Sequence, residues 1–532
     1  MKRSTFLKSA VLAGAGLNAG CGRKRCEPSS PVDAFDFQAN TANRLSVAME
    51  KGETSSVILA KQALKRIEAL ERQGPKLRAV IATNPKALEE AAEAERVLRQ
   101  GKFPNPIFGL PVLVKDNLDT AGMPTTAGSL ALEGSISLRD SFVVGRLKEA
   151  GLVLIGKTNL SEWANFRGQR SISGWSGLGG QTLNPHCLDR SPSESSSGSA
   201  AAVAAGYVPF AVGTETNGSI VTPASACGIV GIKPTVGVVS RTGIIPISSS
   251  QDTAGPMART VADAAALLAM MMGIDENDPA TGRQRGRTDS HRDALLSQKP
   301  RLGAKLGIAR EFFRMHPLVD PVFEKAIASL REMGAELVDP IALPPTSALS
   351  RADSMVMIYE YKAGLNAYFA SLGPDARIKS ITDLIAFNER EAARELWPFG
   401  QERLIEAAGK GPLTDPDYLA AKEQCRVWSE KISAVMDEHQ LDAIVAPSNG
   451  PSATLDPIYG DRGMGDCSTY AAVAGLPHIT VPCGDVFGMP VGLSFFGRAW
   501  SEPLLVEIAL AFEEKTHALR TPQSLSMVSI PG

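Results

Sequence analysis

Amphipathic and apolar segments alternate along most of the chain. Apolar residues recur at helical spacing within 57–70 and 87–98, with charged residues between them, and this spacing predicts two amphipathic helices. Residues 141–159 indicate a helix, a glycine turn and an apolar strand, and residues 198–216 repeat that order. Helices that alternate with short apolar strands predict an α/β fold whose sheet is covered by helices on both faces.

The later part of the chain bears on domain organisation. Residues 275–293 are polar and are expected to form an exposed loop. From about Ala352 to Gln424 the pattern is mostly helical, and strand and turn signals return after it. Strand signals on both sides of this block predict one domain over 45–525, with a helical insertion at about 352–424 and a polar linker over 22–44 before the domain.

The first 21 residues differ from the rest of the chain. The basic stretch MKRSTFLK is followed by a short apolar to small-residue stretch and Cys21. This is too short for a permanent membrane span and predicts an export signal, hence a periplasmic or cell-envelope protein. RSTFLK resembles a twin-arginine signal but has one arginine, and LNAGC resembles a lipobox whose Leu lies one place too early. The sequence leaves open the export route, membrane attachment through a lipidated Cys21, and the alternative of a frayed N-terminal helix in a cytosolic protein.

Composition and charge narrow the function classes. The chain is 44% hydrophobic and 21% charged, with a formal net charge of −2, which is ordinary for a soluble globular protein and offers no basic cluster for nucleic acid. The cysteines after the N-terminal stretch have no C-x-x-C spacing, so they indicate neither a disulfide framework nor a zinc site. They are expected to be mostly small buried hydrophobes; they are Cys26, Cys187, Cys227, Cys425, Cys467 and Cys483.

Histidine is scarce, and this limits the hydrolytic chemistry that the chain can perform. There are six His, none in a G-x-S-x-G motif, and there is no H-E-x-x-H. A Ser-His-Asp triad is disfavoured but not excluded, because distant residues can assemble one. Without His, a serine nucleophile needs another base, and a lysine can serve where burial makes it neutral near pH 7.

Lys115 is the candidate for that base. It follows the apolar run 110–114, at the end of a predicted strand, where side chains converge in open α/β sheets. The alternative is a surface lysine at a strand tip that pairs with Asp116.

Two stretches of small residues supply the candidate serines. They are SPSESSSGS at 191–199 and GTETNGSIVTPAS at 213–225. Each alone is compatible with a solvated loop, a helix N-cap or a strand-ending turn. A turn of successive small residues also directs backbone N–H groups into one concavity, which suits the oxyanion that forms when a serine attacks a carbonyl.

The ordered motifs resemble those of the amidase signature family, from about residue 45 to 520. They are GLPVLVKDNLDTAGMPTTAGS, GKTNLSEWANF, SESSSGSAAAVAAGYVPFAVGTETNGSIVTPA, SQDTAGPMARTVADAA and GLPHITVPCG. The resemblance implies an α/β/α sandwich around a large mixed β-sheet, and a Ser–Ser–Lys triad.

The resemblance assigns a role to each candidate residue. Lys115 takes the place of the base. Ser195 takes that of the bridging serine, which the family holds through a cis peptide, and Ser219 that of the nucleophile. The oxyanion hole would be formed by Thr216, Asn217, Gly218 and the Ser219 amide. No metal and no organic cofactor are implied.

Within the family, the resemblance is strongest to peptide amidases, in Ser161–Pro185 and in GTETNGSIVTPA. It implies hydrolysis of linear amides, above all C-terminal amides of peptides, through an acyl-enzyme with release of ammonia. The partner is then a small-molecule or short peptide amide, and the protein a monomer or homodimer. Tyr359, Tyr361 and Phe369 would line the cleft through which substrate enters; the alternative is that they are core aromatics of a helix.

One position departs from the family pattern. Glu194 stands where the family has Gly, just before the bridging serine. If that Gly adopts φ > 0, a Glu costs about 1 kcal/mol in backbone strain, and its carboxylate could hold Lys115 protonated; the alternative is an outward-pointing side chain. Two competing functions remain. One is an A subunit of a tRNA-dependent amidotransferase, which shares the family signature, and the other is a non-catalytic binding homologue impaired by Glu194.

Overall fold

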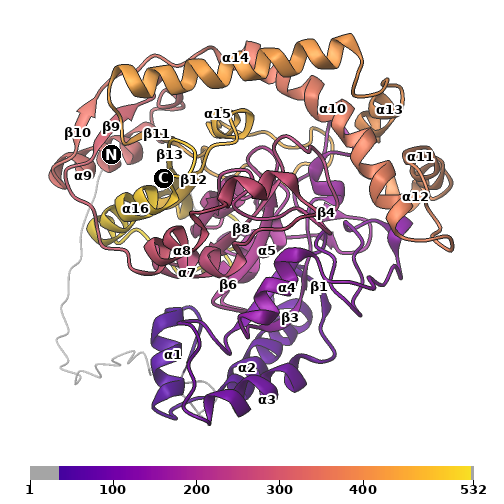
Figure 1. Cartoon of the computed structure of the whole chain (residues 1–532), viewed down its shortest axis with the longest axis horizontal. Helices are drawn as coiled ribbons and strands as arrows, with labels where there is room; N and C mark the ends of the chain where they lie inside the picture. The colour runs from indigo at the N-terminus through magenta and orange to yellow at the C-terminus, as the bar shows by residue number, and fades with distance from the viewer. Residues whose placement is uncertain (1–34, 529–532) are drawn as a thin grey trace, which may run out of the picture. The chain divides into compact units, whose positions relative to one another are not determined.

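An eleven-stranded mixed β-sheet is the central element of the computed structural model, which describes residues 35–528 (Figure 1). The strand order is β1-β3-β2-β6-β8-β7-β12-β13-β11-β9-β10. The strands of the sheet are β1 (Val80–Thr83), β2 (Pro111–Lys115), β3 (Val153–Thr158), β6 (Phe210–Glu215), β7 (Val230–Lys233), β8 (Thr253–Ala258), β9 (Lys305–Ile308), β10 (Glu336–Val338), β11 (Ala443–Pro447), β12 (His478–Val486) and β13 (Met489–Phe496). A separate two-stranded ribbon pairs β4 (Trp175–Ser176) with β5 (Gly180–Gln181). The predicted α/β architecture around a large mixed sheet is confirmed.

Helices pack against the sheet and account for the apolar runs of the sequence. Outside the insertion they are α1 (Ala42–Glu50), α2 (Ser56–Glu68), α3 (Ala87–Leu98), α4 (Phe142–Glu149), α5 (Ser197–Ala204), α6 (Val221–Ala226), α7 (Val261–Met271), α8 (Thr288–Leu296), α9 (Asp320–Glu332), α15 (Ser468–Val473) and α16 (Glu502–Thr516). The two predicted amphipathic helices correspond to α2 and α3. The first helix, α1, begins inside the segment expected to be a linker, and the predicted export signal lies outside the described residues.

Helix α5 approaches the sheet closely because its residues are small. All of its residues are buried, and it packs on β2, β6 and β8. A Cβ added at Gly198 would lie 2.3 Å from the carbonyl oxygen of Asn159, so no larger residue fits there without a backbone shift. This close approach fixes the loop before α5, which carries Ser195, against the ends of the central strands.

A block of helices lies between β10 and β11. It comprises α10 (Thr346–Ser371), α11 (Ile381–Arg390), α12 (Ala392–Glu395), α13 (Glu402–Ala408) and α14 (Pro416–Glu438). The block contains the segment expected to be a helical insertion and extends beyond both of its ends. Figure 1 shows α10 and α14 as the long orange helices of the chain. This block of helices shares a hydrophobic core with the rest of the described chain, because Tyr361 and Phe369 of α10 pack in one cluster with Trp163 and Phe166.

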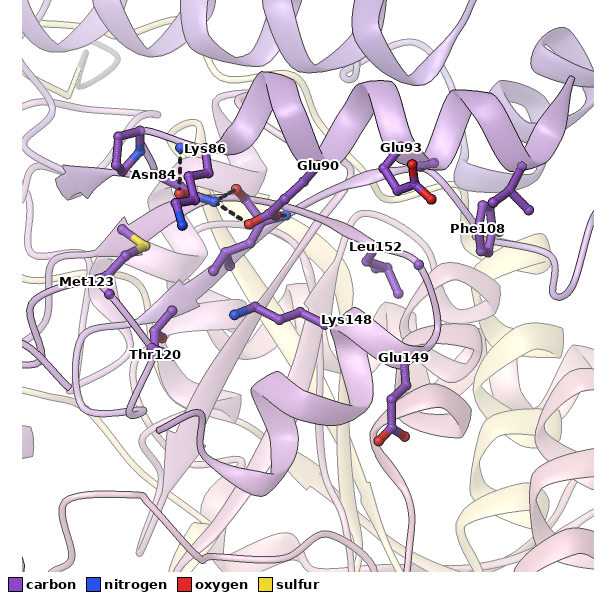
Figure 2. A pocket seen from close by; sticks show the side chains of 17 residues that line it. Asn84, Lys86, Glu90, Glu93, Phe108, Thr120, Met123, Lys148, Glu149 and Leu152 are labelled. Carbon is purple, nitrogen blue, oxygen red and sulfur yellow. Dashed lines mark hydrogen bonds between the residues drawn. The ribbon is translucent and has the colours of Figure 1, made fainter. Parts of the chain in front are cut away.

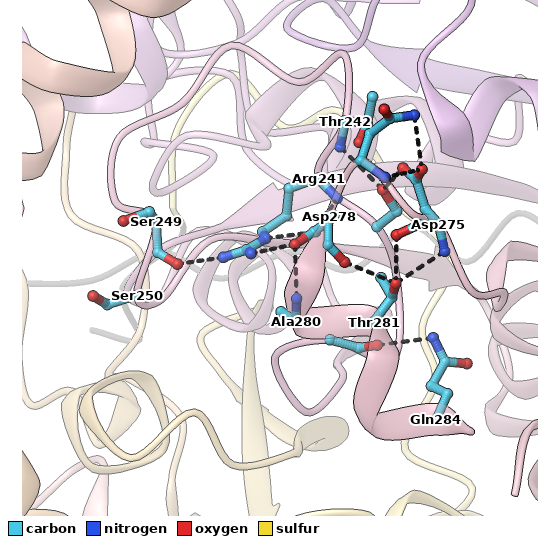
Figure 3. Close-up of polar contacts among 12 residues, drawn as sticks. Arg241, Thr242, Ser249, Ser250, Asp275, Asp278, Ala280, Thr281 and Gln284 are labelled. Carbon is cyan, nitrogen blue, oxygen red and sulfur yellow. Dashed lines mark hydrogen bonds and ion pairs between the residues drawn. The ribbon is translucent and has the colours of Figure 1, made fainter. Parts of the chain in front are cut away.

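The polar segment 275–293 was expected to be an exposed loop; many of its residues are exposed, but much of it is helical. It forms a 3-10 turn (Pro279–Gln284) and the first residues of α8. Figure 3 shows its polar side chains bonded to neighbouring loops, with the Arg241 guanidinium donating to Asp278 at 2.8 Å. Gln284 is fully buried and donates to two backbone carbonyls. The prediction of a loop was wrong, because several of these polar groups find hydrogen-bond partners inside the fold and hold the segment in helical turns.

The described cysteines are free thiols. Four of them, Cys187, Cys227, Cys467 and Cys483, are buried, and Cys425 is half-buried, as expected for small hydrophobes. Across residues 35–528 there is no group of His, Cys, Asp and Glu that could hold a metal ion. In that same range, no helix is long and apolar enough to cross a membrane.

Leu113 gives a test of the central packing. It is fully buried in β2, so Leu113→Ala should lower the free energy of unfolding by about 3 kcal/mol through lost burial and a residual cavity. Leu138, which is 92% exposed, is the matched control, and Leu138→Ala should change stability by about 0.5 kcal/mol or less. Denaturant unfolding of both variants checks this, and equal losses would contradict the assigned burial.

Candidate functional site

The candidate residues meet at the carboxyl ends of two neighbouring parallel strands. β2 pairs with β6 in the register Val112↔Phe210 to Val114↔Val212, so the ends of these strands lie side by side. Lys115 is the last residue of β2, and the loop that carries Ser219 follows β6. Ser195 lies just before α5. The sheet edge therefore brings together all three residues of the predicted triad.

Lys115 is fully buried and surrounded by oxygen acceptors. Its Nζ lies 2.7 Å from Ser195 Oγ, 3.0 Å from Ser196 Oγ and 2.9 Å from Thr214 Oγ1. Burial lowers the pKa of Lys115 to about 7, against the opposing effect of the Glu215, Asp252 and Glu194 charges. A substantial fraction of this lysine is thus neutral near pH 7, as a general base requires.

Asp116 pairs with a different lysine. Its Oδ1 lies 3.0 Å from Lys157 Nζ, with both side chains buried, and its other oxygen accepts from the amide of Thr126 at 3.2 Å. The alternative of a surface Lys115 paired with Asp116 is therefore wrong. Lys157 supplies the countercharge for Asp116, and Lys115 has no directly bonded carboxylate among the described residues.

The two serine loops are tied to each other through the backbone. The amide of Ser196 donates to the carbonyl of Ser219 at 3.2 Å. In the part of the chain that the structure describes, no hydrogen bond joins the hydroxyls of Ser195 and Ser219. The cis peptide bonds of residues 35–528 precede Pro340 and Pro398, so the cis peptide implied for Ser195 is absent.

The nucleophile loop is shaped by a buried carboxylate and one glycine. Glu215 Oε2 accepts from the amides of Ile220 at 2.7 Å and Val221 at 3.0 Å. Gly218 has φ +84°, a conformation that glycine adopts without a Cβ penalty. Among the described residues, the amides of Asn217 and Ser219 have no acceptor, so both are available to an oxyanion.

The side chains of Thr216 and Asn217 hold this loop in place through hydrogen bonds to residues outside it. Thr216 donates to Asp252 at 2.6 Å, and Asn217 Nδ2 donates to Asp353 of α10 at 2.9 Å. Asn217 Oδ1 accepts from Ser468 at 2.6 Å. The helical insertion thus helps to position the predicted oxyanion hole through Asp353.

Sequence reasoning missed several residues that organise the site. Thr214 and Ser196 contact Lys115, and Asn117 donates to Thr214 Oγ1 at 3.0 Å. Asn117, Ser196 and Thr214 stand inside the motifs already singled out, two residues or fewer from a candidate or a loop glycine. Asp353 lies far away in the sequence and carries no such signal.

A cavity of about 230 Å³ opens onto Ser219. Its polar lining includes Glu194, Asn217, Arg403 and Asp466, and its apolar lining includes Phe166, Ile247 and Met357. A larger hollow has a volume of about 560 Å³, and Figure 2 shows some of the side chains that line it, among them Asn84, Glu90 and Lys148. None of the predicted triad residues lines that hollow, so the smaller cavity is the candidate substrate site.

The aromatic residues expected at the cleft do not line this cavity. Tyr359 packs against Tyr418, while Tyr361 and Phe369 lie in the core shared with Phe166. All three are at least 95% buried. The alternative of core aromatics therefore describes them, because α10 turns a different face, with Ser354 and Met357, toward the cavity.

Glu194 does not carry the expected backbone strain. The positive φ falls on Ser193, at +65°, and not on Glu194. The Glu194 side chain points into the cavity lining and not outward. Burial and the charges of Asp466 and Asp461 raise the pKa of Glu194 well above its usual range, and the pKa of Lys115 is lowered to about 7 even with Glu194 nearby.

Comparisons by sequence and by structure both find similar proteins over most of the chain. The sequence model described as Amidase matches residues 59–506. Native peptide amidase from Stenotrophomonas maltophilia has a similar solved structure, with 48% identity and a TM-score of 0.85 over 92% of this chain and 99% of that one. A protein named Probable amidase from Arabidopsis thaliana is 36% identical over 92% of this chain and 93% of its own length. The A subunit of a glutamyl-tRNA(Gln) amidotransferase from Acinetobacter baumannii (strain AYE) is 35% identical over 90% of this chain and 97% of its own length.

Thr214 provides a test of the polar shell around the lysine. Thr214→Val removes the hydroxyl that accepts from Lys115 and Asn117 and leaves buried donors unpaired, so the free energy of unfolding should fall by about 2 kcal/mol. Thr83→Val, on an exposed position of β1, is the control and should have little effect. Thermal or denaturant unfolding measures both, and an unchanged Thr214→Val protein would mean that this shell does not bear on stability.

Proposed function

Because the chain belongs to the amidase family and is an amide hydrolase, we propose that it removes the C-terminal amide of short peptides by way of a Ser219 acyl-enzyme. The observation that carries this proposal is the contact of 2.7 Å between the buried Lys115 amine and Ser195 Oγ, beside the cavity that holds Ser219. The similarity to peptide amidase supports the choice of substrate class.

The first step is activation of the nucleophile. Neutral Lys115 takes a proton from Ser195, and Ser195 takes one from Ser219 Oγ, which attacks the amide carbon. The hydroxyls of Ser195 and Ser219 are not hydrogen-bonded to each other in the structure, so their contact forms as substrate binds. Such catalytic contacts commonly tighten only in the complex.

The second step is collapse of the tetrahedral intermediate. Its oxyanion accepts from the amides of Asn217 and Ser219, which are turned to the site by Gly218 and by the anchoring of the loop. The relay returns a proton to the leaving nitrogen, which departs as ammonia. Water, activated by the same relay, then attacks the acyl-enzyme and releases the peptide carboxylate.

Two other functions agree less well with these observations. An amidotransferase A subunit shares the similarity over most of the chain, but it works in the cytosol, and the predicted export signal argues against it. The lowered pKa of Lys115 argues against a non-catalytic homologue. A lysine that is partly neutral near pH 7 is suited to act as a base, and a binding protein has no evident use for it. We also propose export to the periplasm or cell envelope, which rests on the N-terminal sequence alone.

Ammonia release tests the proposed reaction directly. The mature protein should release ammonia from C-terminally amidated dipeptides, and Ser219→Ala should lower kcat by a factor of about 10³ or more, because the covalent route is lost. Ser225→Ala, a buried serine of α6 outside the cavity, is the matched control. Retained release in Ser219→Ala would overturn Ser219 as nucleophile.

The pH profile tests Lys115 as base. Only the neutral amine accepts a proton, and burial lowers the Lys115 pKa to about 7. The ratio kcat/KM should therefore rise with pH through 7 and fall about tenfold for each pH unit below it. Lys115→Arg, which stays charged, should be inactive across the range. A profile that stays flat from pH 5 to 8 would contradict this role.

A further inference from the structure

Glu194 occupies an unusual place beside the nucleophile loop. Its side chain lines the cavity that holds Ser219 and also an adjoining hollow of about 120 Å³. A Cβ added at Gly218 would come within 2.8 Å of Glu194 Oε2. The carboxyl therefore lies against the residue that directly precedes Ser219, close to where the carbonyl of a substrate would sit.

Further carboxyl groups share this region. Asp466 lines the Ser219 cavity, and Asp461 lines the adjoining hollow. Asp466 accepts from the amide and hydroxyl of Ser468, and Asp461 accepts from the amide and hydroxyl of Ser173. Over residues 35–528, no ion pair involves any of these three carboxyls, and Glu194 has no hydrogen bond.

Three cations lie near these carboxyls, and two of them line the same spaces: Arg403 the Ser219 cavity and Arg462 the adjoining hollow. Lys115 is bonded to hydroxyls, Arg403 stacks on Phe166 at 4.7 Å, and Arg462 stacks on Tyr459 at 4.2 Å. The remaining neighbouring carboxylate, Glu215, is held by backbone amides. Within the described part of the chain, neither arginine forms an ion pair with these carboxyls, although Arg403 adds a positive charge to the cavity that holds Ser219.

This arrangement is unfavourable unless a proton or a cation neutralises it. Burial, together with the charges of the exposed Asp466 and Asp461, raises the pKa of Glu194. In the free protein, a retained proton relieves the repulsion. A ligand ammonium or guanidinium would replace that proton and gain charge-assisted hydrogen bonds.

We propose that Glu194, with Asp466, selects substrates that carry a cationic group on the residue whose amide is cleaved. This rests on the proposed function, since it takes Ser219 to mark the scissile carbonyl. The cation is either the α-ammonium of an amino acid amide or a basic side chain. Both present the same chemistry within one residue of the carbonyl, and the two sources are separated by experiment.

Matched substrates test the charge preference. Nα-acetyl-arginine amide is compared with the nearly isosteric, neutral Nα-acetyl-citrulline amide, and alanine amide is compared with N-acetylalanine amide. The wild-type protein should favour the cationic member of at least one pair by about tenfold in kcat/KM, mainly through KM, as one half-buried charge pair supplies. The pair that shows the preference identifies the source of the cation.

Two variants assign the preference to Glu194. Glu194→Gln keeps the shape but not the charge and should bring the ratio of cationic to neutral substrate close to one. Glu89→Gln, an exposed carboxylate in the first turn of α3, should leave the ratio unchanged. A wild-type ratio near one in both pairs, or a ratio that survives in Glu194→Gln, would overturn the inference.

Binding to the Ser219→Ala variant separates this inference from the proposed hydrolysis. Calorimetric titration of the same pairs should show the same preference without turnover. If no amide is hydrolysed but binding still favours the cation, the proposed function fails and the charge selection stands. If binding shows no preference, the charge selection fails whatever the turnover.

Discussion

The desolvation of Lys115 is the constraint on which the rest of the site depends. An amine can act as a base near neutral pH only if its charged form is made costly, and here strands β2 and β6 place it where no water reaches. The acceptors from Ser195, Ser196 and Thr214 hold the amine in place without a directly paired carboxylate. A carboxylate bonded directly to the Lys115 amine would raise the pKa of Lys115 back toward its ordinary value, and the amine would then be charged at neutral pH.

Two buried carboxylates have ion-pair partners of their own. Asp116 has its own lysine, Lys157, and the buried Glu162 pairs with Arg167 at 2.6 Å. Breaking either pair would leave a buried charge uncompensated, which typically costs several kcal/mol. Arg167 also lies 3.6 Å from Glu395, so these charges compensate one another, and Lys115 forms no ion pair with any of them.

Glu194 shows how this balance tolerates an acid beside the nucleophile. Burial, and then the charges of Asp466 and Asp461, raise the pKa of its carboxyl, and this disfavours a negative charge near a developing oxyanion. The same feature makes it responsive to a cation. On the proposed charge selection, Glu194 changes which ligands the cavity favours, while the contact between Lys115 and Ser195 and the unpaired amides of Asn217 and Ser219 remain.

The sequence by itself determined the class of fold, the lysine at a strand end and the two serine loops, because periodicity and small-residue turns are local properties of the chain. The tertiary structure decided which groups meet. It paired Asp116 with Lys157, brought Asp353 to Asn217, folded the polar segment 275–293 into helical turns and turned Met357, instead of Tyr359, toward the cavity. A helix such as α10 carries apolar residues on several faces, and only the neighbours that pack on each face determine which residues remain open to a ligand.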